Sequence, residues 1–234
     1  MDEKKILLGI FAKEPLPGKV KTRLTPPLSA TQAAELYRLS LKETVEALSG
    51  GSFSPVIFYA GDPEYFRTAF PQVPLVSQGP GDLGMRLSRA LGALLGAGEG
   101  AALVGSDSPD LPATLVKEAL SALSRAEVVT IPARDGGYVL IGERRHHPEL
   151  FRQIPWSTAA VLSETRARAE ACGLSYLEVG AWEDIDDRPS LERFLRRSPD
   201  SATARFAAPI LAGAAEGRPV IRGEGGAAAD RPGG

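Results

Sequence analysis

The sequence predicts an α/β fold with a mostly parallel central sheet and helices on both of its faces. Apolar segments of strand length alternate with amphipathic segments along most of the 234 residues, which is the pattern of a sheet covered by helices. The first apolar run, residues 6–12, lacks a polar face, and this is typical of a parallel strand buried on both sides. The chain length suits one domain of ordinary size.

The expected strands are short apolar runs that end at glycine, proline or polar residues. They are residues 6–12, 55–61, 73–78, 101–107, 127–133, 138–143 and 174–180. An Asp-Gly-Gly turn separates the fifth and sixth runs, so these two form either a hairpin or two neighbouring sheet strands. The last strands are candidates for antiparallel pairing.

Helical spacing of apolar residues and helix-end signals predict the helices between these strands. They are residues 29–48, 63–70, 82–96, 112–126, 157–173 and 188–197. Ser29 or Thr31 suits the start of the first helix, and Pro112 suits the first turn of the fourth, where a missing amide proton costs little. Gly173 suits the end of the fifth.

The composition of the chain changes near residue 198. Residues 1–197 are expected to form the folded domain. Residues 198–234 are rich in Ala, Gly and Pro without sustained periodicity, and they predict a C-terminal extension that is largely disordered, although residues 209–213 could dock locally.

Composition excludes several functional classes. The formal net charge of −2 argues against a dedicated nucleic-acid binder. No apolar segment approaches the ~20 residues of a membrane span, and the N-terminus lacks a signal-peptide pattern, so a cytoplasmic protein is expected. The single cysteine, Cys172, cannot form an intramolecular disulfide and is expected to be a packing residue. His146 and His147 are expected to be exposed loop residues without a partner acid.

A basic loop, residues 13–24, follows the first predicted strand. It carries four cationic side chains together with residues that shape the loop: Lys13, Pro17, Gly18, Lys19, Lys21, Thr22 and Arg23. Because ligands of open parallel sheets bind beyond the carboxyl ends of the strands, we expect this loop to hold nucleotide phosphates. The spacing differs from a Walker A motif, which excludes a P-loop NTPase. The alternative is an ordinary solvated basic loop.

Acidic residues follow other strands. Ser106 and Asp107 stand at the end of the fourth strand, where Asp107 suits a hard cation such as Mg²⁺ or Mn²⁺ and Ser106 suits the nucleotide. Asp186, before the last helix, is the expected second metal ligand, while its neighbour Asp187 is expected to cap that helix. Asp110 is expected to cap the helix that follows it, and the alternative is that it assists Asp107 at the metal.

Three further segments are candidates for ligand contacts. Asp82, Gly84 and Arg86 at a helix start suit a base or ribose, or form a plain glycine-rich turn with an N-cap. The remaining two segments suit a hydroxylated or anionic acceptor, and they comprise Asp135, Gly136, Gly137 and Tyr138, then Trp156, Ser157 and Thr158. The alternatives are a tight turn at Asp135 and a helix cap at Ser157.

The motifs PGKVKTRL, GDLGMRL, GSDSPDLP, DGGYVLIG, WST and DIDDRPSL, in this order, resemble bacterial glycosyltransferase-A-like proteins of the nucleotide-diphospho-sugar transferase superfamily. Some members are named arsenosugar-biosynthesis glycosyltransferases, and the sequence is also similar to guanylyltransferases that activate phospholactate or phosphoenolpyruvate. The match covers roughly residues 5–197. The resemblance implies a GT-A-type Rossmann-like three-layer sandwich with Mg²⁺ or Mn²⁺ at Asp107.

One acid of the family pattern is absent. Where such folds commonly have Asp-x-Asp, this sequence reads Ser106-Asp107-Ser108. Nucleotidyltransferases of the superfamily often pair a strand-end acid with a late acid before the last helix, a layout that Asp107 and Asp186 fit.

The sequence therefore predicts a metal-dependent transferase that uses an activated nucleotide. The leading hypothesis is sugar transfer from a nucleotide diphosphate to a small acceptor, with Asp107 at the metal, Lys21 stabilising the departing diphosphate and Asp135 orienting the acceptor or acting as base. The first alternative is nucleotidyl transfer from an NTP to a phosphorylated small molecule. The second is a nucleotide-binding module without turnover. The sequence does not predict the oligomeric state.

Overall fold

The computed structural model describes residues 6–49 and 53–215, and its core is a seven-stranded sheet in the order β3-β2-β1-β4-β6-β5-β7. The strands are β1 (Ile6–Lys13), β2 (Val56–Ala60), β3 (Leu75–Ser77), β4 (Gly100–Gly105), β5 (Val128–Pro132), β6 (Tyr138–Glu143) and β7 (Tyr176–Glu178). Every pairing is parallel except those of β6, which runs antiparallel to both β4 and β5. The predicted α/β fold is confirmed, and the β5–β6 connection is a hairpin.

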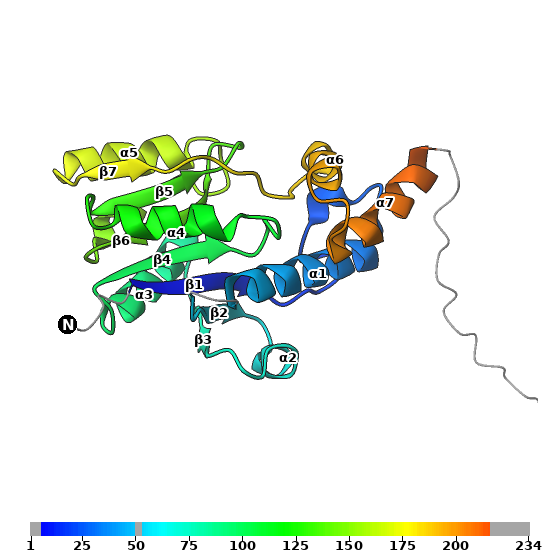
Figure 1. The fold of residues 1–234 in the computed structure, drawn as a ribbon, viewed down its shortest axis with the longest axis horizontal. Coiled ribbons are helices and arrows are strands. Elements are labelled where there is room, and N and C mark those ends of the chain that lie inside the picture. The colour runs from blue at the N-terminus through cyan, green and yellow to red at the C-terminus, as the bar shows by residue number, and fades with distance from the viewer. Residues whose placement is uncertain (1–5, 50–52, 216–234) are drawn as a thin grey trace, which may run out of the picture.

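Helices cover both faces of the sheet, giving three layers (Figure 1). They are α1 (Ala30–Ser49), α2 (Pro63–Ala69), α3 (Leu83–Leu95), α4 (Ala113–Ala122), α5 (Val161–Ala171), α6 (Arg188–Arg197) and α7 (Ala202–Ala215), with short 3₁₀ helices η1 (Thr22–Leu24) and η2 (Pro148–Phe151). One core cluster joins the sheet to α1, α2 and α4, and a second joins it to α3, η2 and α5. None of the described helices is long and apolar enough to span a bilayer.

The order of the strands reverses between β1 and β4. The chain leaves β1 toward β2 and β3, and later returns to β4 on the other side of β1. Because β1 and β4 pair in parallel, with Phe11 opposite Gly105, both strands end at the same edge. Ligands of open α/β sheets bind at this kind of reversal, and the basic loop and Asp107 both begin there.

The C-terminal extension was wrongly predicted over residues 202–215, which form α7. Ala204, Ala207 and Leu211 of α7 are buried in a third core cluster together with residues of α1 and α6, and Figure 1 shows α7 beside α1. The Glu43 carboxylate on α1 also accepts a hydrogen bond from the Ala202 amide at 2.6 Å. The folded part of the chain therefore extends beyond residue 197. Residues 216–234 lie outside the described residues.

Two smaller expectations also need correction. Cys172, predicted as a packing residue, is exposed. The histidines have a partner acid, because His146 Nδ1 lies 2.9 Å from Oε2 of Glu143 and the His147 amide donates to Oε1 of Glu143 at 3.3 Å. Ser88 Oγ completes the chain of contacts at 3.1 Å from His146 Nε2. The sequence separation conceals this cluster, because Glu143 reads as the end of an apolar strand.

Glu143→Gln should make stability less dependent on pH. The Glu143 side chain is fully buried, and burial raises the pKa of its carboxyl group above the ordinary value of 4.5 despite the contact with His146. The native state then holds this proton more tightly than the unfolded chain, so stability falls as pH rises above about 4.5. Each unit of raised pKa corresponds to about 1.4 kcal/mol.

Urea unfolding between pH 4 and pH 8 measures this contribution. We expect the Glu143→Gln variant to lose less stability over this range than the wild type. Glu149→Gln is the matched control, because Glu149 is exposed in the adjoining 3₁₀ helix. Parallel curves for Glu143→Gln and the wild type would contradict the prediction.

Candidate active site

A large cavity of about 940 Å³ lies where β1 and β4 end. Its lining comes from the basic loop, the start of α3, the loop after β4, the β5–β6 hairpin, residues 156–159 and the segment before α6. The volume is at the upper end of the range for small-molecule sites. Segments from most of the chain thus meet at the edge of the sheet predicted to bind ligand.

Asp107 and Asp186 meet in this cavity, although they are far apart in the sequence. The Ile185 amide donates to the Asp107 backbone carbonyl at 2.9 Å and thereby joins the loop after β4 to the segment before α6. Asp187 caps α6, as predicted: its side chain accepts from the Ser190 amide at 2.9 Å. With Asp187 held in the cap, Asp186 is left facing the cavity.

Lys21 binds both of these acids. Its Nζ lies 2.7 Å from Asp107 Oδ1 and 3.2 Å from Asp186 Oδ1, and it also donates to the Ile185 carbonyl. Burial by itself would lower the pKa of Lys21, but the charges of Asp107 and Asp186 raise it above its ordinary value, so the side chain stays cationic. Lys21 therefore contacts acids, whereas the sequence predicted a phosphate contact.

A third acid, Asp184, lies beside the pair. It lines the cavity and accepts a hydrogen bond from Ser108 Oγ. Burial, and then the charge of Asp107, raise the pKa of Asp184 to about 7. The site therefore gathers three acids around one ammonium group.

The other cations of the basic loop remain accessible. Lys13, Lys19, Thr22 and Arg23 all line the cavity and are exposed. Pro17 and Gly18 lie outside the lining, where Gly18 adopts a φ of 72° in the turn. The loop thus presents Lys13, Lys19 and Arg23 to a ligand and turns Lys21 inward.

Ser106 lines the cavity, but its hydroxyl group is engaged within the protein. It donates to the Phe11 carbonyl at 3.1 Å and lies 2.8 Å from the Tyr37 hydroxyl group. Tyr37 in turn accepts from the Lys13 amide at 2.9 Å. The hydroxyl groups of Ser106 and Tyr37 therefore fix the ends of β1 and β4 to α1.

Of the three residues predicted to contact ligand at the start of α3, two line the cavity and one does not. Asp82 caps α3 by accepting from the Met85 amide at 2.8 Å, and it lines the cavity together with Arg86. Gly84 is buried outside the lining, where an added Cβ would lie 2.5 Å from the Phe151 carbonyl oxygen and 2.8 Å from Trp156 Nε1. Gly84 therefore allows α3 to approach the segment that carries Trp156.

The predicted acceptor residues form the other wall. Asp135, Gly137, Tyr138, Trp156, Ser157 and Thr158 line the cavity, whereas Gly136 does not. Asp135 is exposed and its Oδ1 accepts from the Gly137 amide at 2.9 Å, so the expected tight turn coexists with access to the cavity. Ser157 is not a helix cap, because α5 begins at Val161 with Ala160 as its N-cap.

A relative supports the assignment to a family. A solved structure from Desulfovibrio desulfuricans G20, of a proposed nucleotide-diphospho-sugar transferase, is 32% identical, with a TM-score of 0.82 over 90% of this chain and 96% of that chain. The chain belongs to the nucleotide-diphospho-sugar transferase superfamily. Within it, residues 44–158 match the model of a bacterial family described as "Uncharacterized protein conserved in bacteria (DUF2064)". No curated protein matches the sequence.

Solved structures of lower sequence identity share the fold alone. CMP:2-keto-3-deoxy-manno-octonic acid synthetase, solved with CTP, is 14% identical with a TM-score of 0.53 over 83% of this chain and 98% of that chain. Rv0371C from Mycobacterium tuberculosis H37Rv, solved with manganese, is 15% identical with a TM-score of 0.51 over 82% and 98%. Membership of the superfamily places this chain among nucleotide-using transferases.

Three polar residues that line the cavity were not individual candidates in the sequence: Tyr37, Gln78 and Asp184. Tyr37 reads as part of an apolar helix face, and Asp184 lies in an acidic cluster from which only Asp186 was selected. Gln78 is 3% exposed, lines the cavity, and donates from Nε2 to the carbonyls of Ala12 and Phe58 at 3.0 and 2.9 Å. Its position directly after an apolar run was the available signal.

Asp110, expected to cap α4, instead binds the end of α6. Arg197 contacts both carboxylate oxygens of Asp110, and Ser198 Oγ donates to Oδ2 at 2.9 Å. Pro112 occupies the N-cap position of α4. Asp110 therefore holds α6 in place from outside the cavity lining.

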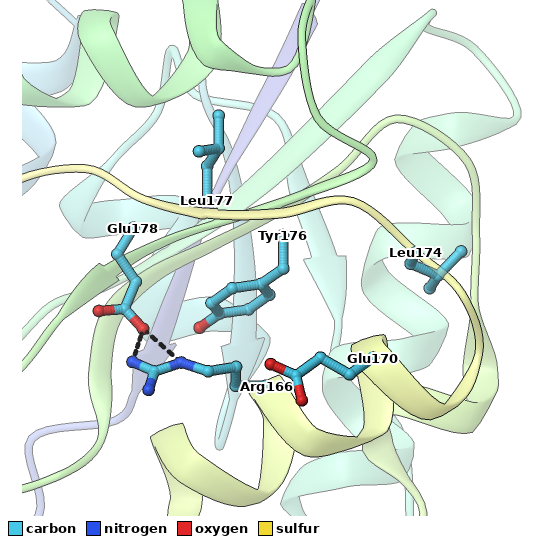
Figure 2. Close-up of a pocket in the computed structure, with 6 residues that line it drawn as sticks. All are labelled: Arg166, Glu170, Leu174, Tyr176, Leu177 and Glu178. Carbon is cyan, nitrogen blue, oxygen red and sulfur yellow. Dashed lines mark hydrogen bonds and ion pairs between the residues drawn. The ribbon is translucent and has the colours of Figure 1, made fainter.

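A second, smaller pocket of about 330 Å³ lies between α5 and β7 (Figure 2). Figure 2 shows its cation, Arg166, paired with Glu178. None of the six residues that line it also lines the large cavity. With Arg166 already neutralised, this pocket is a weaker candidate for a nucleotide.

Proposed function

We propose that the protein is a divalent-metal-dependent transferase that moves the sugar of a nucleotide-diphospho-sugar to a small hydroxylated acceptor. The observation that carries the proposal is the convergence of Asp107 and Asp186 on one cation, inside a cavity also lined by exposed cationic side chains. The 32% identical relative, itself a proposed nucleotide-diphospho-sugar transferase, supports the choice of sugar transfer.

The donor set suits a hard divalent cation such as Mg²⁺ or Mn²⁺. Carboxylate oxygens are the preferred ligands of both ions, and Asp107 and Asp186 already share one positive charge. Within residues 6–49 and 53–215, no three His, Cys, Asp or Glu side chains form a group that could hold a metal. The protein would therefore supply two carboxylates, and phosphate and water oxygens would supply the rest.

Each wall of the cavity would have its own part in the reaction. The metal, when bound, would offset the charge that develops on the departing diphosphate. Lys19 and Arg23 are exposed at the cavity and would bind the phosphates. Asp135, held by the Gly137 amide, would orient the acceptor hydroxyl group or take its proton. Trp156 and Thr158 would form the acceptor surface.

Nucleotidyl transfer from an NTP is the second candidate. The acid pair joins a residue after β4 with a residue before α6, which is the layout that the sequence resemblance associates with nucleotidyltransferases. The positions two residues before and after Asp107 are Gly105 and Pro109, so an Asp-x-Asp arrangement has no equivalent here.

Thermal-shift profiling with Mg²⁺ separates the two reactions. A ligand at 100 times its Kd should stabilise the protein by about 2.7 kcal/mol. Stabilisation by one nucleotide-sugar supports sugar transfer, and conversion of that donor with a panel of hydroxylated acceptors then tests the reaction. Stabilisation by an NTP and by no nucleotide-sugar favours nucleotidyl transfer. A lack of stabilisation by either class overturns both.

Lys19→Gln and Arg23→Gln should each weaken nucleotide binding about 10-fold. Each removes one charge-assisted hydrogen-bond donor from the phosphates, and such bonds contribute about 1.5–3 kcal/mol. Isothermal titration with the nucleotide found in the panel measures the change. Lys117→Gln is the matched control, because Lys117 is exposed on α4 outside the cavity lining. Equal affinities for all three variants would rule out the basic loop as the phosphate site.

A further inference from the structure

The side chain of Lys21 is buried, unlike those of the other cations of its loop. Its side chain is 5% exposed, whereas Lys19 and Arg23 on either side are exposed residues. The backbone at Lys21 is left-handed, with φ 48° and ψ 36°, directly before η1. An L-residue rarely adopts this conformation. At this residue the ammonium group of Lys21 lies against the acids, whereas the side chains of Lys19 and Arg23 are exposed.

The inward ammonium group occupies the space between the two proposed metal ligands. Its Nζ contacts Oδ1 of Asp107 and Oδ1 of Asp186, and a third acid, Asp184, lies nearby. A cation is needed there, because the two carboxylates brought together without one would repel each other. Lys21 supplies that cation.

A divalent ion bound to the same pair of carboxylates would compete with this ammonium group. The two cations would lie a few ångströms apart and repel each other, and Asp107 and Asp186 would have to be shared or exchanged. Nucleotide phosphates at the loop would give the ammonium group another anionic partner. Metal binding would therefore be coupled to nucleotide binding through Lys21.

We propose that Lys21 is a tethered cation that stands in for the divalent metal in the free protein, so that the metal binds well only together with a nucleotide. The proposal rests on the proposed function and adds an order to it: nucleotide phosphates release Lys21, and Asp107 and Asp186 become available to the metal. Lys21 is thereby a regulator of metal entry.

Mn²⁺ alone is the probe, with free Mn²⁺ measured by electron paramagnetic resonance in the absence of nucleotide. We expect Lys21→Met to bind Mn²⁺ at least about 10-fold more tightly than the wild type, since one positive charge has left the site. Lys19→Met is the matched control, because it removes a charge from the same loop without a contact to either acid. It should bind Mn²⁺ about as well as the wild type.

The inference is overturned if Lys21→Met and the wild type bind Mn²⁺ equally, or if neither binds it measurably. It is also overturned if Lys19→Met shows the same gain, which would indicate a general charge effect. Failure of the proposed function is a separate result. It would be seen if no nucleotide stabilises the wild type in the presence of Mg²⁺. If a nucleotide stabilises the wild type but Lys21→Met binds Mn²⁺ no more tightly than the wild type, only the inference about Lys21 fails.

Loss of Lys21 could unfold the protein, because it leaves three acids without a cation. The double variant Lys21→Met/Asp184→Asn addresses this, since it removes the third acid and keeps Asp107 and Asp186. Its Mn²⁺ affinity is compared with that of Asp184→Asn, after circular dichroism has shown both to be folded. The same gain of about 10-fold is expected, and equal affinities would overturn the proposal.

Discussion

Asp107→Asn is expected to lower turnover about 1000-fold and to remove the stabilisation that Mg²⁺ and nucleotide produce together. Asparagine keeps the shape of the side chain but removes the charge that holds a divalent ion, and loss of one preorganised electrostatic contact typically costs 10²–10³-fold in rate. The fold should remain, because the Asp107 side chain is 39% exposed and its pairing with Lys21 is partly screened by solvent.

Asp110→Asn is the matched control for this variant. Asp110 is an acid in the same loop but lies outside the cavity lining and binds Arg197 and Ser198. Its replacement should lower the melting temperature and leave the dependence of turnover on Mg²⁺ unchanged. Turnover and thermal shifts as functions of Mg²⁺ concentration give both results. A wild type that binds nucleotide without turnover, and whose binding is unchanged in Asp107→Asn, would favour the module without turnover.

The sheet could be predicted from sequence because its strands are locally recognisable. β1, β2 and β4 are short apolar runs between polar segments, and their order along the chain fixes which loops lie at the carboxyl edge. Helix α7 was not predictable in the same way. Pro209 lies inside it, its apolar residues are mostly alanine, and the face of α1 that it covers is far away in sequence.

The sequence could predict that Asp107 and Asp186 lie close together, but it could not predict that Lys21 is their shared partner. Two acids placed at the same edge of a sheet follow from the strand order. The choice of Lys21 over Lys19 as their partner depends on a left-handed backbone at one residue, which the four cations of the loop do not reveal. Asp110 illustrates the same limit, because its partner Arg197 lies 87 residues away in the sequence.

Gly136→Ala is expected to destabilise the protein by about 3 kcal/mol. Gly136 has a φ of 90°, and a Cβ there would lie 2.2 Å from the carbonyl oxygen of Ala159. The left-handed backbone contributes about 1 kcal/mol and the forced displacement about 1–3 kcal/mol. Backbone atoms on both sides leave little room for relaxation, because the Gly136 carbonyl also accepts from the Leu162 amide at 2.8 Å.

Gly173→Ala separates these two contributions. Gly173 has a φ of 69°, but an added Cβ there would meet nothing within 4 Å, so its replacement should cost only the backbone contribution of about 1 kcal/mol. Urea unfolding of both variants measures the difference. Because residues 156–159 line the side of the cavity that is proposed to bind the acceptor, the larger loss at Gly136 should be accompanied by weaker acceptor binding. Equal losses for the two variants would mean that the β5–β6 hairpin does not hold that segment against the cavity.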